Sequence, residues 1–573
     1  MKPSYYHGLV LISMVSLSLL LRFFYLDFRP IWLDESYTAL FSLGQGFDAV
    51  PRNILLPVSA IHDIFTLRPS SCPEIAHRVA TQDIHPPLFF CGLHYWLKGI
   101  AQFDVSLAWG LRSFSAILGV VSVIVLYALN RGAFSPMAGL MAAALMAVSP
   151  FHVDLSQEAR HYTAPMLCVA LALLGLVQII NNLGHQRIQL WIWIFWLLVN
   201  IIGLYTHYFF LIAVVAQIGT LLLWMLRHRS HLTFRHWTMA GLAIIALLSS
   251  YLPWLPIILD HMGRPETNWI ALSRTSWVNY IPPIYQKLAG WIIMVVSFPV
   301  EQQPAWIAIP MGVLMVVFFG WLMKEAYGGL RQLRHDSRAR TSAHILICFI
   351  GLVLLQFWVI IYVLGKDLSL APRYNFVYYP AVCALLGATL VNHRSQEKWS
   401  INSSKLSRIN IRFKSALPLL AGGISCIFVI FNLALTTPYN PENLADEIVP
   451  SSPPQLFLMP YQGDTEIALG LSLMWEISQR SNLQTTPLYW SFLPFSTPDP
   501  RPTASLDAVP LVPLPTATSV DLWLLGFRWL PKDFPDQIQG FNADQDTILC
   551  QAKPDTWSSA TLPHQQYGCE PVS

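Results

Sequence analysis

Two adjacent carboxylates, Asp34 and Glu35, follow the first apolar segment of the chain, within the sequence RPIWLDESY. An ionisable residue at the rim of the membrane hydrocarbon is costly, so it is treated first as a functional candidate. The structural alternative is the first turn of a helix beginning near Ile31, where acidic residues favour the positive end of the helix dipole. Adjacent helical residues face different directions. We therefore expect Asp34, rather than Glu35, to face a reacting atom.

Further ionisable groups adjoin later apolar segments. Asp83 and His85 precede two prolines, which could form a rigid elbow aimed at the membrane surface or simply a turn between two helices. Glu158 and Arg160 lie two residues apart in a short segment that could be a solvated turn. Arg160 is the stronger candidate of the two, because a planar guanidinium can hold phosphate oxygens bidentately.

Three more candidates lie at the predicted ends of apolar segments. His207 occupies a turn between two of them, where an interfacial anchor and a ligand are equally acceptable interpretations. Arg373 follows a proline at the start of another segment, so it could snorkel to the interface or clamp a phosphate. Lys366 lies nearby in sequence. Together these groups predict a site for a phosphate-bearing lipid at one face of the membrane.

The composition explains why these charges matter. The chain has 573 residues, of which 54% are hydrophobic and only 12% charged, against about 25% charged in soluble proteins. This indicates a polytopic membrane protein. We find no basic, aromatic-interleaved patch that would suggest nucleic acid binding. The sequence also lacks a serine or cysteine triad, a nucleotide-binding loop and a zinc signature.

Apolar length predicts eleven transmembrane helices. Their ranges are 8–26, 107–128, 133–150, 162–180, 189–205, 208–226, 237–258, 305–323, 343–364, 374–391 and 415–436. With a cytoplasmic N-terminus, acting as an uncleaved signal anchor, the basic loops at Arg131, Arg187, 227–236, 324–340 and 394–414 all lie inside, as the positive-inside rule requires. Two shorter apolar stretches, 88–100 and 288–300, suit interfacial or re-entrant helices better than spans.

This arrangement predicts two domains. Residues 1–436 would form the all-α membrane bundle, with a long first extracytoplasmic loop at 29–106, and the proline-rich residues 437–573 would form a small extracytoplasmic α/β domain. In the second domain the runs QLFLMP, PLYWSFLP, VDLWLLGF and DTILC predict strands, and residues 466–480 predict an amphipathic helix. Cys550 and Cys569 could pair in an oxidising compartment, although Cys72 is a competing partner.

Five motifs in order resemble the family 39 glycosyltransferases of the GT-C superfamily. These are the bacterial relatives of protein O-mannosyltransferases and of the lipid A aminoarabinose transferase, grouped as the RgtA/B/C/D-like or PMT_2 domain. The motifs are WLDES, DIHPPLFF, SPFHVDLSQEARHY, GLYTHYFFL and PRYNFVYYPA, and the resemblance covers roughly residues 8 to 390. His161 departs from the pattern, because relatives commonly carry an apolar residue there, and this leaves open a role in specificity or in phosphate binding.

The resemblance implies a multi-pass enzyme of the cell membrane. It would transfer a sugar, with inversion, from a polyprenyl-phosphate donor to a protein, lipid or glycan acceptor on the non-cytoplasmic side. It further implies that Asp34 is the general base, that Glu35 supports it, and that His85, Arg160 and Arg373 bind the donor phosphate. Lys366 is a further candidate for phosphate binding, because it is near Arg373 in the sequence. A divalent cation is a possible cofactor, with Asp34, Glu35, Asp83 and His207 as potential ligands, and Glu158 is a further substrate or metal candidate.

The main alternative is a lipid flippase or transporter that binds the same phosphate without chemistry. Transporters tend to place polar sites near the bilayer midplane on paired, interrupted helices. Here the candidate charges are predicted at one face and the loops are unequal, which favours the enzyme. A membrane scaffold, the third possibility, would need neither Asp34 nor Arg160.

Overall fold

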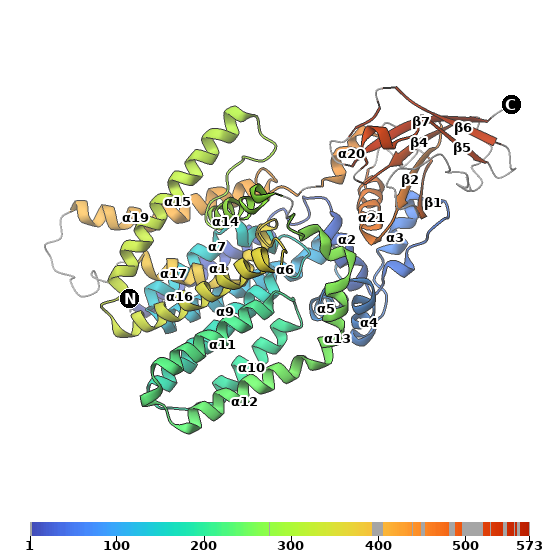
Figure 1. The fold of residues 1–573 in the computed structure, drawn as a ribbon. Helices are drawn as coiled ribbons and strands as arrows, with labels where there is room; N and C mark the ends of the chain where they lie inside the picture. Colours follow the sequence, from blue (N-terminus) through green and yellow to red (C-terminus); the bar gives the residue numbers. More distant parts are fainter. Residues whose placement is uncertain are drawn as a thin grey trace. The chain divides into compact units, whose positions relative to one another are not determined.

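The computed structural model describes most of the chain (Figure 1). The described residues are 3–273, 276–391, 405–437, 439–448, 453–480, 487–494, 519–527, 529–541, 547–554, 556–558 and 562–571. The chain divides into two compact units. The first unit contains residues 1–28, 79–92 and 105–436, and the second contains residues 29–78, 93–104 and 437–573. The second unit begins at the expected residue 437, but it also contains residues 29–78 and 93–104 of the predicted first loop, which were assigned to the membrane domain.

The first unit is a bundle of helices. Its helices are α1 (Pro3–Phe23), α6 (Leu107–Ala133), α7 (Pro136–Ala147), α8 (Pro150–Ser156), α9 (Thr163–Gly184), α10 (Leu190–Leu204), α11 (Phe210–Arg227), α12 (Phe234–Tyr251), α13 (Leu255–Gly263), α14 (Pro282–Ile293), α15 (Ala305–Leu333), α16 (Ser337–Trp358), α17 (Tyr379–Thr389) and α19 (Lys405–Ile430). The centre of the bundle is formed by α6, α7, α9 and α17, which pack against one another. Small residues such as Gly139 and Gly387 allow this close packing, since an added Cβ there would collide with backbone atoms.

Six helices in the described part of the chain are long and apolar enough to cross a membrane, and the bent pair α7 and α8 could provide a seventh span. Four shorter apolar helices cover His7–Phe23, Leu190–Leu204, Tyr379–Thr389 and Ala416–Ile430. The six long and the four shorter apolar helices all overlap ranges that the sequence predicted to be transmembrane helices. The chain is therefore a multi-pass membrane protein, while the count of eleven spans and the cytoplasmic N-terminus remain predictions.

The predicted span at 133–150 is not one straight helix. Helix α7 ends at Ala147 within this range, and α8 continues from Pro150 beyond it, at an angle of 60° to α7. Ser149 caps the N-terminus of α8 by accepting a hydrogen bond from the His152 amide, and Pro150 occupies the first turn. A proline there disfavours helical geometry at the preceding residue, which explains the break.

Helix α14 lies close to the stretch predicted to be interfacial, although it begins at Pro282 rather than Leu288. Together with the short 3-10 helix Trp277–Tyr280 it exposes apolar side chains, namely Trp277, Val278, Ile281, Ile284, Tyr285 and Leu288. Lys287 and Gly290, on the same helix, are buried. An exposed apolar stripe with aromatic members suits the membrane interface.

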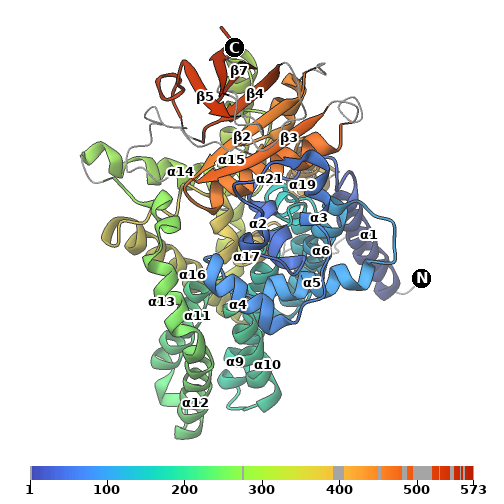
Figure 2. The same cartoon turned by 90° about the vertical axis from the view of Figure 1, so that its right-hand side faces the viewer.

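The second unit contains a seven-stranded sheet with the order β1-β3-β2-β4-β7-β6-β5. Figure 2 shows strands β2, β3 and β4 of this sheet together with helix α21. The strands are β1 (Leu56–Pro57), β2 (Gln455–Tyr461), β3 (Leu488–Pro494), β4 (Val520–Leu525), β5 (Gln537–Phe541), β6 (Thr547–Ala552) and β7 (His564–Pro571). Strand β2 runs parallel to both β3 and β4, and the remaining pairs are antiparallel. The helices α2 (Leu33–Ser42), α3 (Ile61–Ile64), α20 (Pro441–Glu447) and α21 (Asp464–Ser478) complete the unit, and α4 (Cys72–Gln82) and α5 (Leu88–Ile100) each include residues of both units.

The predicted strands in the C-terminal region are confirmed, because β2, β3, β4 and β6 cover the four apolar runs, and α21 covers the predicted helix. Strand β1 was not predicted. It has two residues and pairs with β3, while the Trp490 indole donates a hydrogen bond to the Pro57 carbonyl. The first loop thus supplies an edge strand whose partner, β3, lies more than 400 positions away in the sequence, a separation that no local pattern encodes.

Cys550 and Cys569 form a disulfide between the neighbouring strands β6 and β7. The prediction that these two residues could pair is confirmed. The bond closes a segment with a sequence separation of 19 residues.

Replacing both Cys550 and Cys569 with serine should destabilise the second unit by about 3 kcal/mol, because the unfolded chain regains the entropy that the closed loop removes. The measurement is the denaturation midpoint of the purified protein, with and without reductant. Cys348→Ala, which changes a free cysteine, is the control and should leave the midpoint unchanged. Equal midpoints for the double variant and the wild type would contradict the structural role of the bond.

Candidate functional site

Three turns of the first unit bring ionisable side chains together. They are the segment after α4 with Asp83 and His85, the segment between α8 and α9 with Arg160, and the turn between α10 and α11 with His207. The His85 and His207 rings lie 6.0 Å apart, centroid to centroid. The ring of His161 lies between them, 4.5 Å from each. We call His85, His161 and His207 the imidazole cluster.

A short 3-10 helix, η8 (Pro372–Val377), adds the second arginine. The Arg373 guanidinium lies 5.6 Å from the centroid of the Tyr162 ring, and that of Arg160 lies 6.0 Å from the same ring. Tyr162 is buried and lies 5.8 Å from the His207 ring. Both arginines are thus held on one aromatic ring beside the imidazole cluster, a cation–π arrangement that is stronger away from water.

Asp83 and His85 form a pair. The Nδ1 atom of His85 lies 3.1 Å from both carboxylate oxygens of Asp83, which is buried. Burial by itself raises the pKa of Asp83, but the charge and hydrogen bond of His85, together with the charge of Arg160, outweigh it and lower the pKa. Asp83 is therefore ionised at neutral pH and fixes the orientation of the His85 ring, in the manner of carboxylates that orient catalytic or ligating histidines.

The other two imidazoles are neutral at physiological pH. Burial lowers the pKa of His161 and His207 well below the usual value, and the neighbouring imidazoles and the charges of Arg160 and Arg373 lower it further. The Nδ1 atom of His207 accepts a hydrogen bond from the Phe209 amide at 3.0 Å. In the neutral ring the proton is therefore on Nε2, which is left as a donor.

The segment between α8 and α9 is held by bonds to α1 and α6. The Gln157 side chain donates to the carbonyls of Leu21 and Phe24, and the Ser115 hydroxyl donates to the carbonyl of Arg160 at 3.0 Å. These bonds fix the backbone that carries Arg160 and His161. A fixed backbone matters here, because binding groups must be held in place before the ligand arrives.

Arg22, at the end of α1, was missed in the sequence. It is fully buried and donates to the carbonyls of Met146 and Ala147 and to Nδ1 of His152. Those carbonyls belong to the last turn of α7, where backbone oxygens lack partners in the helix. Arg22 therefore holds the bend that leads into α8. A lone arginine inside an otherwise apolar span is itself a signal of an important polar contact.

The η8 helix, which carries Arg373, is held by contacts with α14 and with Tyr378. Asn375 accepts hydrogen bonds from Lys287 and from the Tyr378 hydroxyl, both at 2.8 Å. An added Cβ at Gly290 would lie 2.6 Å from the Asn375 amide nitrogen, so α14 can approach η8 only because this residue is glycine. These contacts place the segment that carries Arg373.

The remaining predicted residues are Glu158, Lys366, Asp34 and Glu35. Glu158 is buried two residues before Arg160. The Lys366 ammonium donates to the carbonyl of Thr267 at 3.2 Å, and so ties its own turn to the segment after α13. Asp34 and Glu35 belong to the second unit, in the first turn of α2.

The two adjacent carboxylates differ in environment. Glu35 is buried, and its Oε2 atom accepts a hydrogen bond from the Trp32 amide, which caps α2. The Ile31 carbonyl, just before the helix, accepts a hydrogen bond from Ser472 on α21 at 2.6 Å. Asp34 is only half-buried. The helix-capping interpretation therefore fits Glu35, whereas the catalytic role of Asp34 stays a prediction.

The described residues contain no group of three or more His, Cys, Asp or Glu side chains arranged to hold a metal ion. The imidazole cluster therefore does not fit a metal, and we derive no step through one. The possible divalent cation remains a prediction.

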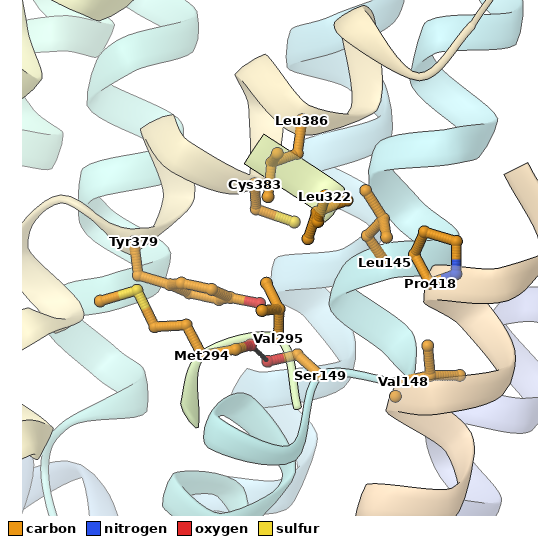
Figure 3. A pocket seen from close by; sticks show the side chains of 11 residues that line it. Leu145, Val148, Ser149, Met294, Val295, Leu322, Tyr379, Cys383, Leu386 and Pro418 are labelled. Carbon is orange, nitrogen blue, oxygen red and sulfur yellow. Dashed lines mark hydrogen bonds between the residues drawn. The ribbon is translucent and has the colours of Figure 1, made fainter. Parts of the chain in front are cut away.

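The first unit also contains a small cavity, of about 20 Å³, far too small for a sugar (Figure 3). Apolar side chains line it, together with Ser149, whose hydroxyl donates to the Met294 carbonyl, and Tyr379. This volume suffices for about one water molecule. The cavity is thus a packing defect beside the bent helix, and the polar turns remain the candidate site.

Part of the candidate site lies in a region that is similar to a known protein family. Residues 85–254 match the family model described as dolichyl-phosphate-mannose-protein mannosyltransferase. The family resemblance is thereby confirmed over these residues. They include His85, Arg160 and His207, but neither Asp34 nor Arg373. No curated protein matches the chain.

Solved structures show more distant likeness. The crystal structure of ArnT from Cupriavidus metallidurans bound to undecaprenyl phosphate has 12% identity and a TM-score of 0.49, covering 97% of both chains. The archaeal oligosaccharyltransferase AglB from Archaeoglobus fulgidus, in complex with an inhibitory peptide and a dolichol-phosphate, has 13% identity and a TM-score of 0.43, covering 82% of this chain and 64% of that one. The oligosaccharyltransferase from the same organism in complex with zinc and sulfate has 14% identity and a TM-score of 0.38, covering 81% and 61%.

Arg22→Met should lower the thermal unfolding midpoint, because the Met146 and Ala147 carbonyls and His152 lose their donor, at about 1–3 kcal/mol for each buried group left unpaired. The measurement is thermal unfolding of the detergent-purified protein. Arg187→Met, at an exposed loop residue, is the matched control and should unfold at the wild-type temperature. If both variants match the wild type, Arg22 does not hold the bend.

Proposed function

We propose that this protein transfers a sugar from a polyprenyl-phosphate donor to an acceptor on the non-cytoplasmic side of the cell membrane. The observation that carries the proposal is the pair of arginines on the Tyr162 ring, buried Arg160 and half-buried Arg373, beside the imidazole cluster. Arg160 and the cluster lie within the segment that matches a family described as dolichyl-phosphate-mannose-protein mannosyltransferase. Two guanidinium groups at the ends of apolar helices suit a ligand that joins a phosphate to a long hydrocarbon.

In this proposal Arg160 and Arg373 bind the donor phosphate, and His85 contributes a further contact whose orientation is set by Asp83. The phosphate is the leaving group, so negative charge grows on it as the sugar–phosphate bond breaks. Fixed positive charge in a site shielded from water stabilises that charge without reorganisation. His207 supplies a neutral Nε2–H donor, and Glu158 and Lys366 are assigned supporting roles in the surrounding turns.

Asp34 is proposed as the general base. The acceptor hydroxyl attacks the anomeric carbon, its proton passes to the Asp34 carboxylate, and the bond from the anomeric carbon to the phosphate oxygen breaks to release polyprenyl phosphate. A single displacement of this kind inverts the anomeric configuration. Glu35 supports Asp34 by fixing the first turn of α2. Membrane lipids surround the enzyme, and the chemistry needs no nucleotide.

The extracytoplasmic location of the second unit is supported by its disulfide, since disulfides persist in oxidising compartments. Because Asp34 belongs to this unit, the reaction is assigned to the same side.

Asp34→Asn should reduce the turnover number by about 10²–10⁴-fold, the usual contribution of a positioned general base, with normal expression and membrane insertion. The assay follows transfer of labelled sugar from a polyprenyl-phosphate donor in proteoliposomes. Asp63→Asn, at an exposed carboxylate on α3 of the same unit, serves as the control and should retain full turnover. Wild-type turnover in Asp34→Asn would rule out the base assignment.

A further inference from the structure

His161 is a buried polar residue whose hydrogen-bonding capacity the protein does not use. Its exposed fraction is 0%, and neither Nδ1 nor Nε2 has a hydrogen-bond partner among the described residues. A buried polar atom left unpaired costs about 1–3 kcal/mol, and most such atoms in folded proteins find partners. An apolar side chain would pack in the same place without this cost.

The neighbours of His161 do not relieve the cost. The rings of His85 and His207 lie 4.5 Å away, but His85 directs Nδ1 to Asp83, and Nδ1 of His207 is occupied by the Phe209 amide. The Phe89 and Tyr162 rings also lie near the His161 ring, at centroid distances of 6.0 and 4.6 Å. His161 is therefore held in position by rings while both of its nitrogens are unpaired.

The charges around His161 specify the kind of ligand that would pair with it. Arg160 and Arg373 both act on its ring electrostatically, so the surroundings favour an anion. They also keep the ring neutral, because positive neighbours and burial both disfavour protonation. A neutral imidazole offers one donor and one acceptor, on opposite sides of the ring.

We infer that His161 binds the donor lipid where the phosphate is joined to the sugar. One ring nitrogen donates a hydrogen bond to a phosphate oxygen, and the other accepts one from a sugar hydroxyl. The inference rests on the proposed function and extends it to donor specificity. A bare polyprenyl phosphate offers the first partner but not the second. His161 is thus a specificity residue that favours the glycosylated donor over the spent carrier.

The test compares His161→Leu and His161→Asn with the wild type. Leucine removes both nitrogens, whereas asparagine retains one donor and one acceptor. His152→Leu is the matched control, because His152 is equally buried but receives a hydrogen bond from Arg22. The measurements are the thermal midpoint without ligand, the KM and kcat for a polyprenyl-phosphate sugar, and the Kd for undecaprenyl phosphate.

For His161→Leu we expect an unchanged or higher thermal midpoint, a KM for the glycosylated donor raised by about 10- to 100-fold, and a Kd for undecaprenyl phosphate raised by clearly less. His161→Asn should recover much of the KM. His152→Leu should lower the midpoint, because Arg22 loses its acceptor.

The inference is overturned if His161→Leu lowers the midpoint as His152→Leu does and leaves the donor KM within about twofold of the wild type. It is also overturned if the donor and the bare carrier lose affinity equally. In both cases wild-type transfer would still stand, so the proposed function would survive. A wild-type protein that neither binds nor uses the donor would overturn both.

Discussion

The burial of positive charge at the ends of apolar helices is the constraint on which the first unit depends. Arg160 and Arg373 lie against the ring of Tyr162, and isolated charges are expensive to remove from water. The surrounding turns meet this cost with a ring face, an ionised Asp83 and neutral imidazoles. Their backbones are fixed by Gln157, Ser115 and the Lys287–Asn375 contact. The same arrangement is well suited to an anion that carries its own hydrocarbon.

Arg22 is also a buried arginine, but its role is structural. Arg22 uses its guanidinium on backbone carbonyls and on His152, and so belongs to the scaffold. His161 and His152 differ in the same way. One has both nitrogens unpaired beside two arginines, and the other completes a structural contact. Burial alone therefore does not separate structural from functional polar groups. The two histidines differ because Nδ1 of His152 has a partner in Arg22, whereas neither nitrogen of His161 has one among the described residues.

The sequence predicted the apolar helices, the four central runs of the C-terminal sheet and the gathering of His85, Arg160, His207 and Arg373 at related turns, because hydrophobic length and charge placement are local signals. It did not predict the bend at Ser149, which depends on a proline and on Arg22 together. Nor did it predict β1, since pairing of Leu56 with Trp490 is a long-range contact. Lys366 was grouped with the phosphate ligands from sequence proximity, but its ammonium contacts Thr267.

The central claim is that the protein breaks the bond between a sugar and a polyprenyl phosphate. In the most direct measurement, purified protein in liposomes receives a polyprenyl-phosphate hexose labelled in the sugar, and a membrane extract provides the acceptor. The labelled acceptor and the free polyprenyl phosphate are then quantified in the absence of any nucleotide. The account predicts that label leaves the lipid while an equal amount of free polyprenyl phosphate appears. Intact donor that merely changes leaflet would contradict it and would identify a flippase.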